Sequence, residues 1–256
     1  MSHSLQVTAH DSWNQLRRHT AARIGLGRAG AGLPTAETLR FKLAHAQARD
    51  AVHEGLDDRG LLQELMEFSL GVHCVQSLAR DRQEYLHRPD YGRGLNQNSR
   101  KLLGEQANAD FDLAIVIADG LSARAIGNHA VRFLRVLLPM LPDWRLAPLV
   151  VAHQGRVAIG DEIGFLLRAQ SVVVMIGERP GLSSPDSLGI YMTYAPSPGM
   201  TDERRNCISN IRDEGLSHQA GATKLAWLLQ QSFSRKLSGV RLKEETKEPP
   251  PGLCFS

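Results

Sequence analysis

Apolar residues alternate between strand-like and helix-like patterns over residues 110–235. Four short runs are apolar along almost their whole length, at residues 111–120, 144–155, 171–181 and 188–194. In the second run Pro148 lacks the N–H that a sheet needs, so its strand is predicted to start at Leu149. Strands that are apolar on both faces and alternate with helices are typical of parallel sheets with right-handed crossovers. The pattern therefore predicts an α/β fold with a doubly wound, Rossmann-like and mainly parallel sheet.

The segments between these runs have apolar residues at helical spacing. The helix that follows Ser122, its predicted N-cap, has apolar residues at offsets 0, 3, 4, 7 and 8 from Ala130. A shorter helix is predicted within residues 159–167. The last helix is predicted from about Ser217 to residue 237, with Gly239 as its stop.

Residues 1–100 are more polar and are predicted to be helical. Thr35 is expected to cap a helix that is entered after Pro34, and Leu39 and Leu43 recur there at helical spacing. The charged, proline-rich end of the chain is expected to be disordered. The predicted organisation is a helical N-terminal region at 1–100, a Rossmann-like ligand-binding domain at 101–240 and a disordered tail at 241–256.

Length and composition narrow the class of protein. A chain of 256 residues can form one large domain, or a core domain with appended segments, without disulfide or metal staples. Its 30 basic and 27 acidic residues lack the excess of positive charge that marks a dedicated nucleic-acid binder. No apolar run approaches the ~18 residues of a membrane span. The scattered cysteines, Cys74, Cys207 and Cys254, form no C-x-x-C and suit a reducing cytoplasm without a zinc site.

The stretch GLGRAGAG, residues 25–32, matches the dinucleotide-binding pattern G-x-G-x-x-G. Such a site needs a buried strand before the glycines and a helix directly after them. Here the polar residues 13–24 come before, and Pro34 comes shortly after. We interpret the glycines as a tight turn between two helices, or as a docking turn at which Arg23 and Arg28 bind a partner.

Glycine and polar residues follow three of the predicted strands where each strand ends. The segments are ADGLS at 118–122, HQGRV at 153–157 and IGERPGLSSPDS at 176–187. Ligands of open α/β sheets bind at the shared carboxyl edge, so these segments and a polar loop at 204–211 predict one binding edge. No phosphate-loop, G-x-S-x-G or H-E-x-x-H pattern occurs. We therefore expect a ligand-binding edge that has no catalytic residue and no metal ligand of its own.

Six longer segments permit a closer comparison. They are ARIGLGRAGAGLPTAETLRFKLAHAQARDAV at 22–52, RPDYGRGL at 88–95, IVIADGLSARAI at 115–126, GRVAIGDEIG at 155–164, VVVMIGERPGLSSPDSLGIYMTYAP at 172–196 and RNCISNIRDEGLS at 205–217. In this order they resemble the small (light) subunit of ethanolamine ammonia-lyase, and the resemblance covers about residues 13–240. It implies an adenosylcobalamin-dependent carbon–nitrogen lyase that converts ethanolamine to acetaldehyde and ammonia.

The resemblance also implies a partner and a shared cofactor site. In that family a large TIM-barrel subunit holds the substrate, and the corrin lies at the interface between the two subunits of a hetero-oligomer with several copies of each. The helical region at 1–100 is then expected to contact the large subunit. The cobalamin-contact positions of the family fall on Val157 in GRV, Glu178 in GER and Cys207 in RNCISN.

The chemistry of a corrin suggests what each of these residues does. A corrin is apolar on its face and fringed with amides, so Val157 is expected to pack against it and Glu178 to accept hydrogen bonds. Alternatively, Glu178 pairs with Arg179, and Cys207 is either part of the contacting wall or a buried structural thiol. The cobalamin-carrier pattern D-x-H-x-x-G is absent, so no histidine is expected to bind cobalt.

Two other functions stay open at this point: a nucleotide- or flavin-binding α/β oxidoreductase, and a non-catalytic scaffold for a large subunit. No contact with nucleic acid or membrane is expected. Some members of the family carry a longer polar N-terminal extension linked to packaging in a bacterial microcompartment, whereas about a dozen residues precede the matching region here. Residence in the cytoplasm is expected, either free or inside such a microcompartment.

Overall fold

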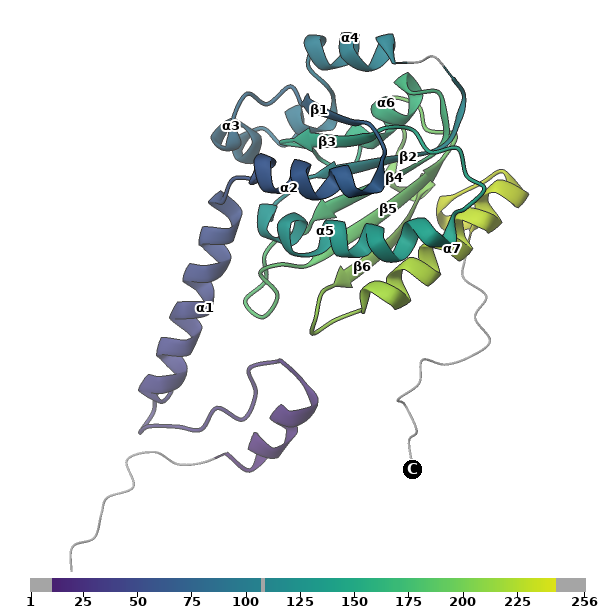
Figure 1. The fold of residues 1–256 in the computed structure, drawn as a ribbon. Helices are drawn as coiled ribbons and strands as arrows, with labels where there is room; N and C mark the ends of the chain where they lie inside the picture. The colour runs from purple at the N-terminus through teal and green to yellow at the C-terminus, as the bar shows by residue number, and fades with distance from the viewer. Residues whose placement is uncertain (1–10, 107–108, 243–256) are drawn as a thin grey trace, which may run out of the picture.

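A six-stranded mixed sheet forms the centre of the molecule (Figure 1). The computed structural model describes residues 11–106 and 109–242, so Cys254 and most of the tail that the sequence predicts to be disordered lie outside the described residues. The strands are β1 (Val72–Gln76), β2 (Phe111–Ala118), β3 (Leu149–His153), β4 (Ala169–Gly177), β5 (Leu188–Tyr194) and β6 (Arg205–Ile211). Their order is β1-β3-β2-β4-β5-β6; the first four are parallel, and β5 and β6 each run antiparallel to the strand before.

The α/β class is confirmed, but the sheet is mixed. Residues 188–194 form a strand as predicted, yet β5 runs antiparallel to β4. Only the ten residues from 178 to 187 join the two strands, which is too few for a helical crossover.

The prediction of a polar loop at 204–211 is wrong, because residues 205–211 form the edge strand β6. This strand buries Ile208 and leaves Cys207 exposed. Residues 1–100 also contain a strand, β1, at the other edge of the sheet. The two edge strands, β1 and β6, mix polar and apolar residues, so they lack the apolar runs that mark central strands.

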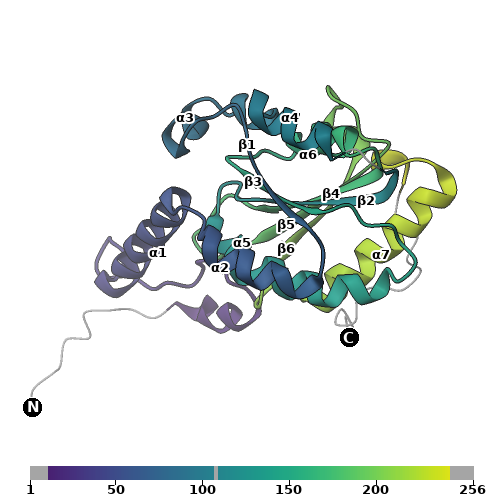
Figure 2. The ribbon, with the colours of Figure 1, turned by 45° about the horizontal axis from the view of Figure 1, so that its top comes forward.

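Helices cover both faces of the sheet (Figure 2). The α-helices are α1 (Thr35–His53), α2 (Asp58–Leu65), α3 (Arg82–His87), α4 (Gln97–Glu105), α5 (Ala123–Leu137), α6 (Ile159–Leu166) and α7 (His218–Arg235). Short 3-10 segments are η1 (Ser12–His19), η2 (Met66–Phe68), η3 (Tyr91–Arg93), η4 (Leu138–Met140), η5 (Asp202–Arg204) and η6 (Gly239–Arg241). Residues of α2, α5 and α7 join one face of the sheet in a first apolar cluster that includes Phe133 and Leu225. Residues of α4 and α6 join the other face in a second cluster that includes Leu103 and Ile163.

Local capping explains where the helices begin and end. Ser122 caps α5 as predicted, because its Oγ accepts a 3.2 Å hydrogen bond from the backbone N–H three residues later. The last helix stops before Lys236, which has a left-handed φ of 54°, and not at Gly239. Thr35 is not a cap: it is the first residue of α1, and Pro34 holds the cap position without a side-chain hydrogen bond.

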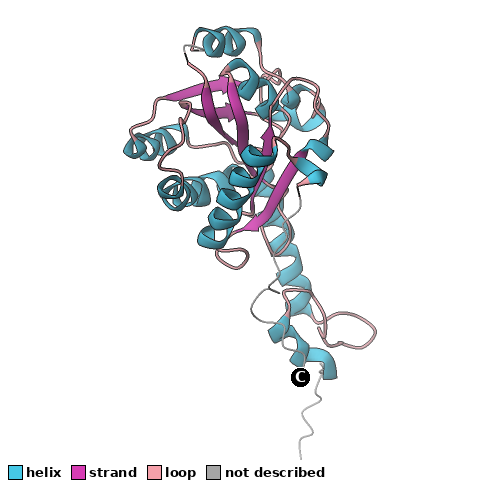
Figure 3. Ribbon diagram, turned by 90° about the vertical axis from the view of Figure 1, so that its right-hand side faces the viewer, coloured by secondary structure: helices cyan, strands magenta, loops and turns pink. Residues whose placement is uncertain are grey.

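The N-terminal part of the chain forms an arm, which we define as η1, the glycine turn and α1. Figures 1 and 3 show α1 projecting from the body of the molecule. Ala51 is the one buried residue that α1 contributes. Leu39 and Leu43 are each 60% exposed and Trp13 is 64% exposed. The helical spacing of the two leucines is confirmed, but their side chains do not reach a core. No described helix is both long and apolar enough to cross a membrane.

Candidate ligand-binding site

The carboxyl ends of β3, β2 and β4 lie side by side at one edge of the sheet, as the parallel pairing requires. The Leu121 N–H donates to the Gly177 carbonyl at 2.9 Å, and the Gly155 N–H donates to Asp119 Oδ1 at 3.2 Å. The three segments that the sequence singles out are therefore bonded to one another. They form one continuous edge and not three independent loops.

Two glycines make this close approach possible. A Cβ at Gly177 would lie 2.0 Å from the Ser122 carbonyl oxygen, and a Cβ at Gly120 would lie 2.3 Å from the Gly177 carbonyl oxygen. Gly120 also has a φ of +56°, a conformation that favours glycine. Larger residues would push the strand exits apart, so these glycines serve backbone packing at the edge.

Two residues of α3 brace this edge without belonging to any recognisable motif. Arg82 Nη1 donates to the Gly120 carbonyl at 2.6 Å and lies 3.6 Å from Asp119 Oδ2. The Tyr85 hydroxyl donates to the Gly155 carbonyl at 3.0 Å. Burial raises the pKa of Asp119, although the positive charge of Arg82 opposes this shift. The turns after β2 and β3 are thus held from the side by α3.

Glu178 directly follows β4 and is half-buried. Its Oε2 accepts hydrogen bonds from the Ser187 hydroxyl and, at 3.3 Å, from the Asn210 N–H. Gly189 makes room for the carboxylate, because a Cβ there would lie 3.0 Å from Glu178 Oε1. Both hydrogen bonds that reach this carboxylate within the described residues end on Oε2, and neither uses Oε1. The described ion pairs include none between Glu178 and Arg179, so the alternative of a neighbouring pair is not realised.

Cys207 of β6 lies directly opposite Tyr191 of β5. The two side chains lie close together, since each influences the pKa of the other. Burial raises the pKa of the Cys207 thiol; the neighbouring Tyr191 hydroxyl opposes this shift, and the nearby Glu178 carboxylate adds to it. Although its thiol is partly shielded from water, Cys207 as a residue is exposed. It is therefore not the buried structural cysteine of the alternative interpretation.

Val157 lies in the turn between β3 and α6 and is half-buried. Its carbonyl accepts a 3.1 Å hydrogen bond from the Gly160 N–H, which starts the first turn of α6. Its side chain packs against the second apolar cluster, as does the side chain of Tyr191. Val157 therefore lies on the same face of the sheet as the tyrosine that contacts Cys207.

We call the surface formed by Glu178, Tyr191 and Cys207, with Val157 at its border, the shelf. On this face α6 covers β2 and β4. The α-helices that pack most closely against β5 and β6 within the described residues are α5 and α7, on the opposite face. Cys207 is exposed and the other three residues are half-buried, so the shelf is a partly exposed surface with polar groups beside it. No sequence motif identifies Tyr191. Strand alternation does place it on the face opposite the apolar residues Ile190 and Met192, and this was the available signal.

The glycine stretch at 25–32 is a turn, as interpreted. It lies between η1 and α1, and two of its residues exchange backbone hydrogen bonds of 3.0 and 3.1 Å. No described strand precedes it, so the dinucleotide-binding alternative lacks its structural basis. Arg23 donates to the Leu182 carbonyl at 3.3 Å and so anchors the arm to the loop after β4. Arg28 is exposed.

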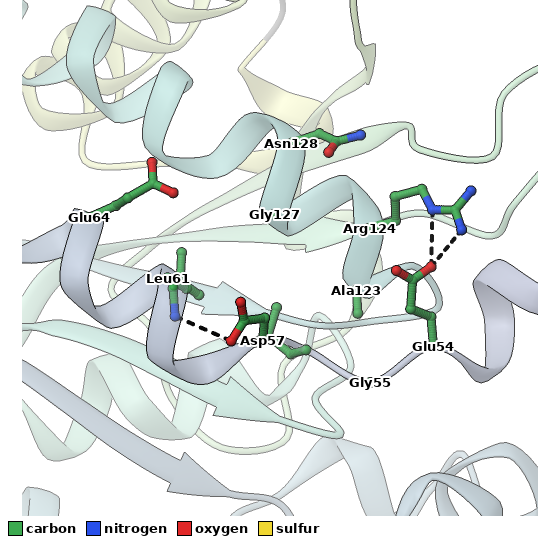
Figure 4. Close-up of a pocket in the computed structure, with 11 residues that line it drawn as sticks. Glu54, Gly55, Asp57, Leu61, Glu64, Ala123, Arg124, Gly127 and Asn128 are labelled. Atoms are coloured by element: carbon green, nitrogen blue, oxygen red, sulfur yellow. Dashed lines mark hydrogen bonds and ion pairs between the residues drawn. The ribbon is translucent and has the colours of Figure 1, made fainter.

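A separate hollow of 290 Å³ lies between α2 and α5 (Figure 4). Figure 4 shows Glu54 and Arg124 pointing toward each other, and Glu54 Oε2 accepts hydrogen bonds of 3.0 and 2.7 Å from this arginine. Asp57 caps α2 by accepting from the Gly60 N–H at 3.2 Å. These polar groups already have partners: the ion pair ties the segment before α2 to α5, and the cap stabilises the first turn of α2.

A histidine pair connects α5 and α7 with the loop after β4. Nδ1 of the buried His129 lies 3.2 Å from His218 Nε2, and its Nε2 lies 3.4 Å from Asp186 Oδ2. Burial lowers the pKa of His218, and the charge of Arg132 lowers it further. The unfolded chain therefore binds a proton at this position more readily than the folded chain.

We expect this difference to make the protein less stable in mild acid. The free energy of unfolding falls as pH drops through about 6.5, the pKa of an unperturbed histidine, toward the lower pKa of the folded state. His218→Gln removes this contribution and flattens the decline between pH ~7.5 and ~5.5, measured by urea denaturation. His87→Gln, at an exposed histidine outside the pair, is the matched control. Equal flattening in both variants would contradict the assignment.

The fold defines an α/β protein with a six-stranded mixed sheet and an exposed N-terminal arm. The described residues contain no group of three or more histidine, cysteine, aspartate or glutamate residues that could hold a metal ion. Comparison with protein families identifies the chain further: the model of the ethanolamine ammonia-lyase light chain family matches residues 10–243. The chain therefore belongs to the ethanolamine ammonia-lyase light chain family.

Curated relatives are similar over most of their length. The ethanolamine ammonia-lyase small subunit of Xanthomonas campestris pv. campestris (strain B100) is 54% identical over 244 residues, which cover 93% of this chain and 90% of the relative. The small subunit of Azotobacter vinelandii is 53% identical over 240 residues, or 92% and 89% of the two chains. That of Pseudomonas putida is 51% identical over 245 residues, or 94% and 90%. The family resemblance found in the sequence is thus confirmed.

Proposed function

We propose that this chain is the small subunit of an adenosylcobalamin-dependent ethanolamine ammonia-lyase, a carbon–nitrogen lyase that converts ethanolamine to acetaldehyde and ammonia. Membership of the family over residues 10–243 is the observation that carries the proposal. The word "subunit" in the names of the relatives supports a hetero-oligomer with a large subunit that supplies the substrate site.

The shelf is compatible with a corrin in shape and chemistry. A corrin needs a broad surface that meets its apolar face and offers hydrogen-bond partners to its amide fringe. The half-buried side chains of Val157 and Tyr191 provide apolar area, and Glu178 Oε1 provides an acceptor beside it. Exposed Cys207 extends the surface across β6. We therefore assign Val157, Glu178 and Cys207 to cofactor contact.

The residues of this chain bind the cofactor and orient it. Bound adenosylcobalamin supplies radical chemistry through cleavage of its cobalt–carbon bond. Glu178, held by Ser187 and Asn210, accepts hydrogen bonds from the amide fringe in a fixed direction. Val157 excludes water from the apolar face. The hydrogen-bonded carboxyl ends of β2, β3 and β4 make this half of the site rigid. Binding energy from the large subunit is then available to strain the cofactor when substrate binds.

We assign the exposed arm to the interface with the large subunit, because a row of uncovered leucines is typical of a protein–protein contact. Replacing both Leu39 and Leu43 by serine is expected to abolish co-purification with the large subunit, since it removes apolar area from α1 without touching a core. Arg28→Ala is expected to weaken co-purification less. Val240→Ser is the matched control, because Val240 is 65% exposed outside the arm. Unchanged assembly of the double variant would contradict the assignment.

The proposed activity is tested by co-expressing this chain with the large subunit of a close relative and measuring acetaldehyde formation from ethanolamine. Activity is expected to require both chains and adenosylcobalamin. Binding of NAD or flavin by the purified chain would instead favour the oxidoreductase alternative. Full cobalamin affinity of the large subunit without this chain would favour the scaffold alternative.

We place the complex in the cytoplasm, either free or inside a bacterial microcompartment. Composition and the scattered cysteines support a reducing compartment. Cell fractionation distinguishes the two: an encapsulated complex sediments with shell proteins, whereas a free complex stays in the supernatant.

A further inference from the structure

Tyr191 lies on the shelf, where the cofactor assignment uses only the apolar area of its ring. Its neighbours on β5, Ile190 and Met192, are buried in the first apolar cluster on the other face. Tyr191 packs against the second cluster instead and stays half-buried. A tyrosine at such a place buries its ring and keeps its hydroxyl for a polar partner.

The sheet register places this ring at the centre of the shelf. Tyr191 lies opposite Val174 of β4 on one side and Cys207 of β6 on the other. Glu178 follows the same β4 strand and lies close enough to influence both the hydroxyl and the thiol. The residues assigned to cofactor contact on β4 and β6 are therefore bridged by Tyr191.

The hydroxyl of Tyr191 is protonated. Burial raises its pKa, and the adjacent Cys207 and Glu178 raise it further, so the phenol is neutral at physiological pH. The Cys207 side chain lies beside it across the strand pair. A phenol oxygen that donates its proton still accepts hydrogen bonds. The free acceptor capacity suits the N–H of a primary amide, the group that fringes a corrin.

We propose that Tyr191 is a further cofactor-positioning residue, whose hydroxyl accepts a hydrogen bond from an amide of the corrin. This inference rests on the proposed function. It adds a second polar contact to the shelf, beside that of Glu178.

The test uses the assembled complex of both subunits and cyanocobalamin as the probe, with retention followed by its visible absorbance. Tyr191→Phe removes only the hydroxyl and is expected to weaken retention about tenfold, the effect of one lost hydrogen bond. Tyr194→Phe is the matched control: it lies on the same strand but packs edge-on against Phe233 of α7, at 6.0 Å between ring centroids. This control is expected to retain cyanocobalamin like the unmodified complex.

A cycle with Cys207 separates positioning from simple packing. Cys207→Ala and Tyr191→Phe are expected to be non-additive, because the two side chains are neighbours across the β5–β6 pair. Thermal stability and subunit assembly are expected to stay unchanged in Tyr191→Phe. Unchanged retention in this variant, or a loss that merely parallels a loss of stability, would overturn the inference. Failure of the unmodified complex to retain cyanocobalamin would instead contradict the proposed function.

Discussion

Replacing Glu178 by alanine is expected to weaken cobalamin retention by the assembled complex about 30-fold, and ethanolamine deamination with it at limiting cofactor. The carboxylate is the one charged acceptor assigned to the shelf, and hydrogen bonds to charged groups contribute about 1.5–3 kcal/mol. Ser187 and Asn210 hold the carboxylate in a fixed position. We therefore expect no neighbouring side chain to replace it as an acceptor. Retention is measured by titration of the complex with cyanocobalamin.

Three companion variants make this result specific. Glu178→Gln keeps one acceptor oxygen and is expected to lose less than the alanine variant. Val157→Ala removes only apolar contact and is expected to cost about 1 kcal/mol, or roughly fivefold in retention. Glu105→Ala, at an exposed position on α4, is the matched control for loss of a surface charge. Wild-type retention in Glu178→Ala and Val157→Ala would remove both residues from the cofactor site.

Replacing Arg205 by alanine is expected to lower the free energy of unfolding by about 3–5 kcal/mol, because it leaves a buried partner without its counter-charge. The Arg205 and Asp161 side chains are each 2% exposed, and they are joined by a charged hydrogen bond between β6 and α6. Arg205 also donates to Asp202 Oδ1 at 2.6 Å and to the Met200 carbonyl at 3.1 Å. This pair ties β6, the strand that carries Cys207, to α6.

The pH dependence and a control identify the cause of this loss. Burial raises the pKa of Asp161 even beside Arg205. A raised carboxyl pKa gives stability at low pH that is lost as pH rises through the pKa of the folded state. The charge of Arg205 lowers this pKa, so the pKa of Asp161 rises further when Arg205 is removed. The loss of unfolding free energy in Arg205→Ala is therefore expected to be larger at neutral than at acidic pH, as measured by urea denaturation. Arg145→Ala removes an ion pair with Asp112 in which Arg145 is 62% exposed, and it is expected to cost less than about 1 kcal/mol. Equal losses in the two variants would show that burial of the pair is not responsible.

Residues that are neighbours in the chain account for what the sequence predicts correctly. The runs that became β2 and β4 are buried on both faces, so their burial appears as consecutive apolar residues. The hydroxyl of Ser122 bonds a backbone N–H only three residues away, so it too is recognisable locally. The place of the proposed binding edge follows from parallel pairing of these strands, and the family resemblance supplied its candidate residues.

The sequence by itself therefore determined the α/β class, the central strands, the glycine turn of the arm and the family. Only the tertiary structure decided the direction of β5, the existence of β1 and β6 and the bridging position of Tyr191. The physical reason is that these features depend on pairing between distant segments. Half-buried edge strands carry no continuous apolar run, and the partner of Tyr191 or Arg205 is set by strand register and helix packing, which no short stretch of residues encodes.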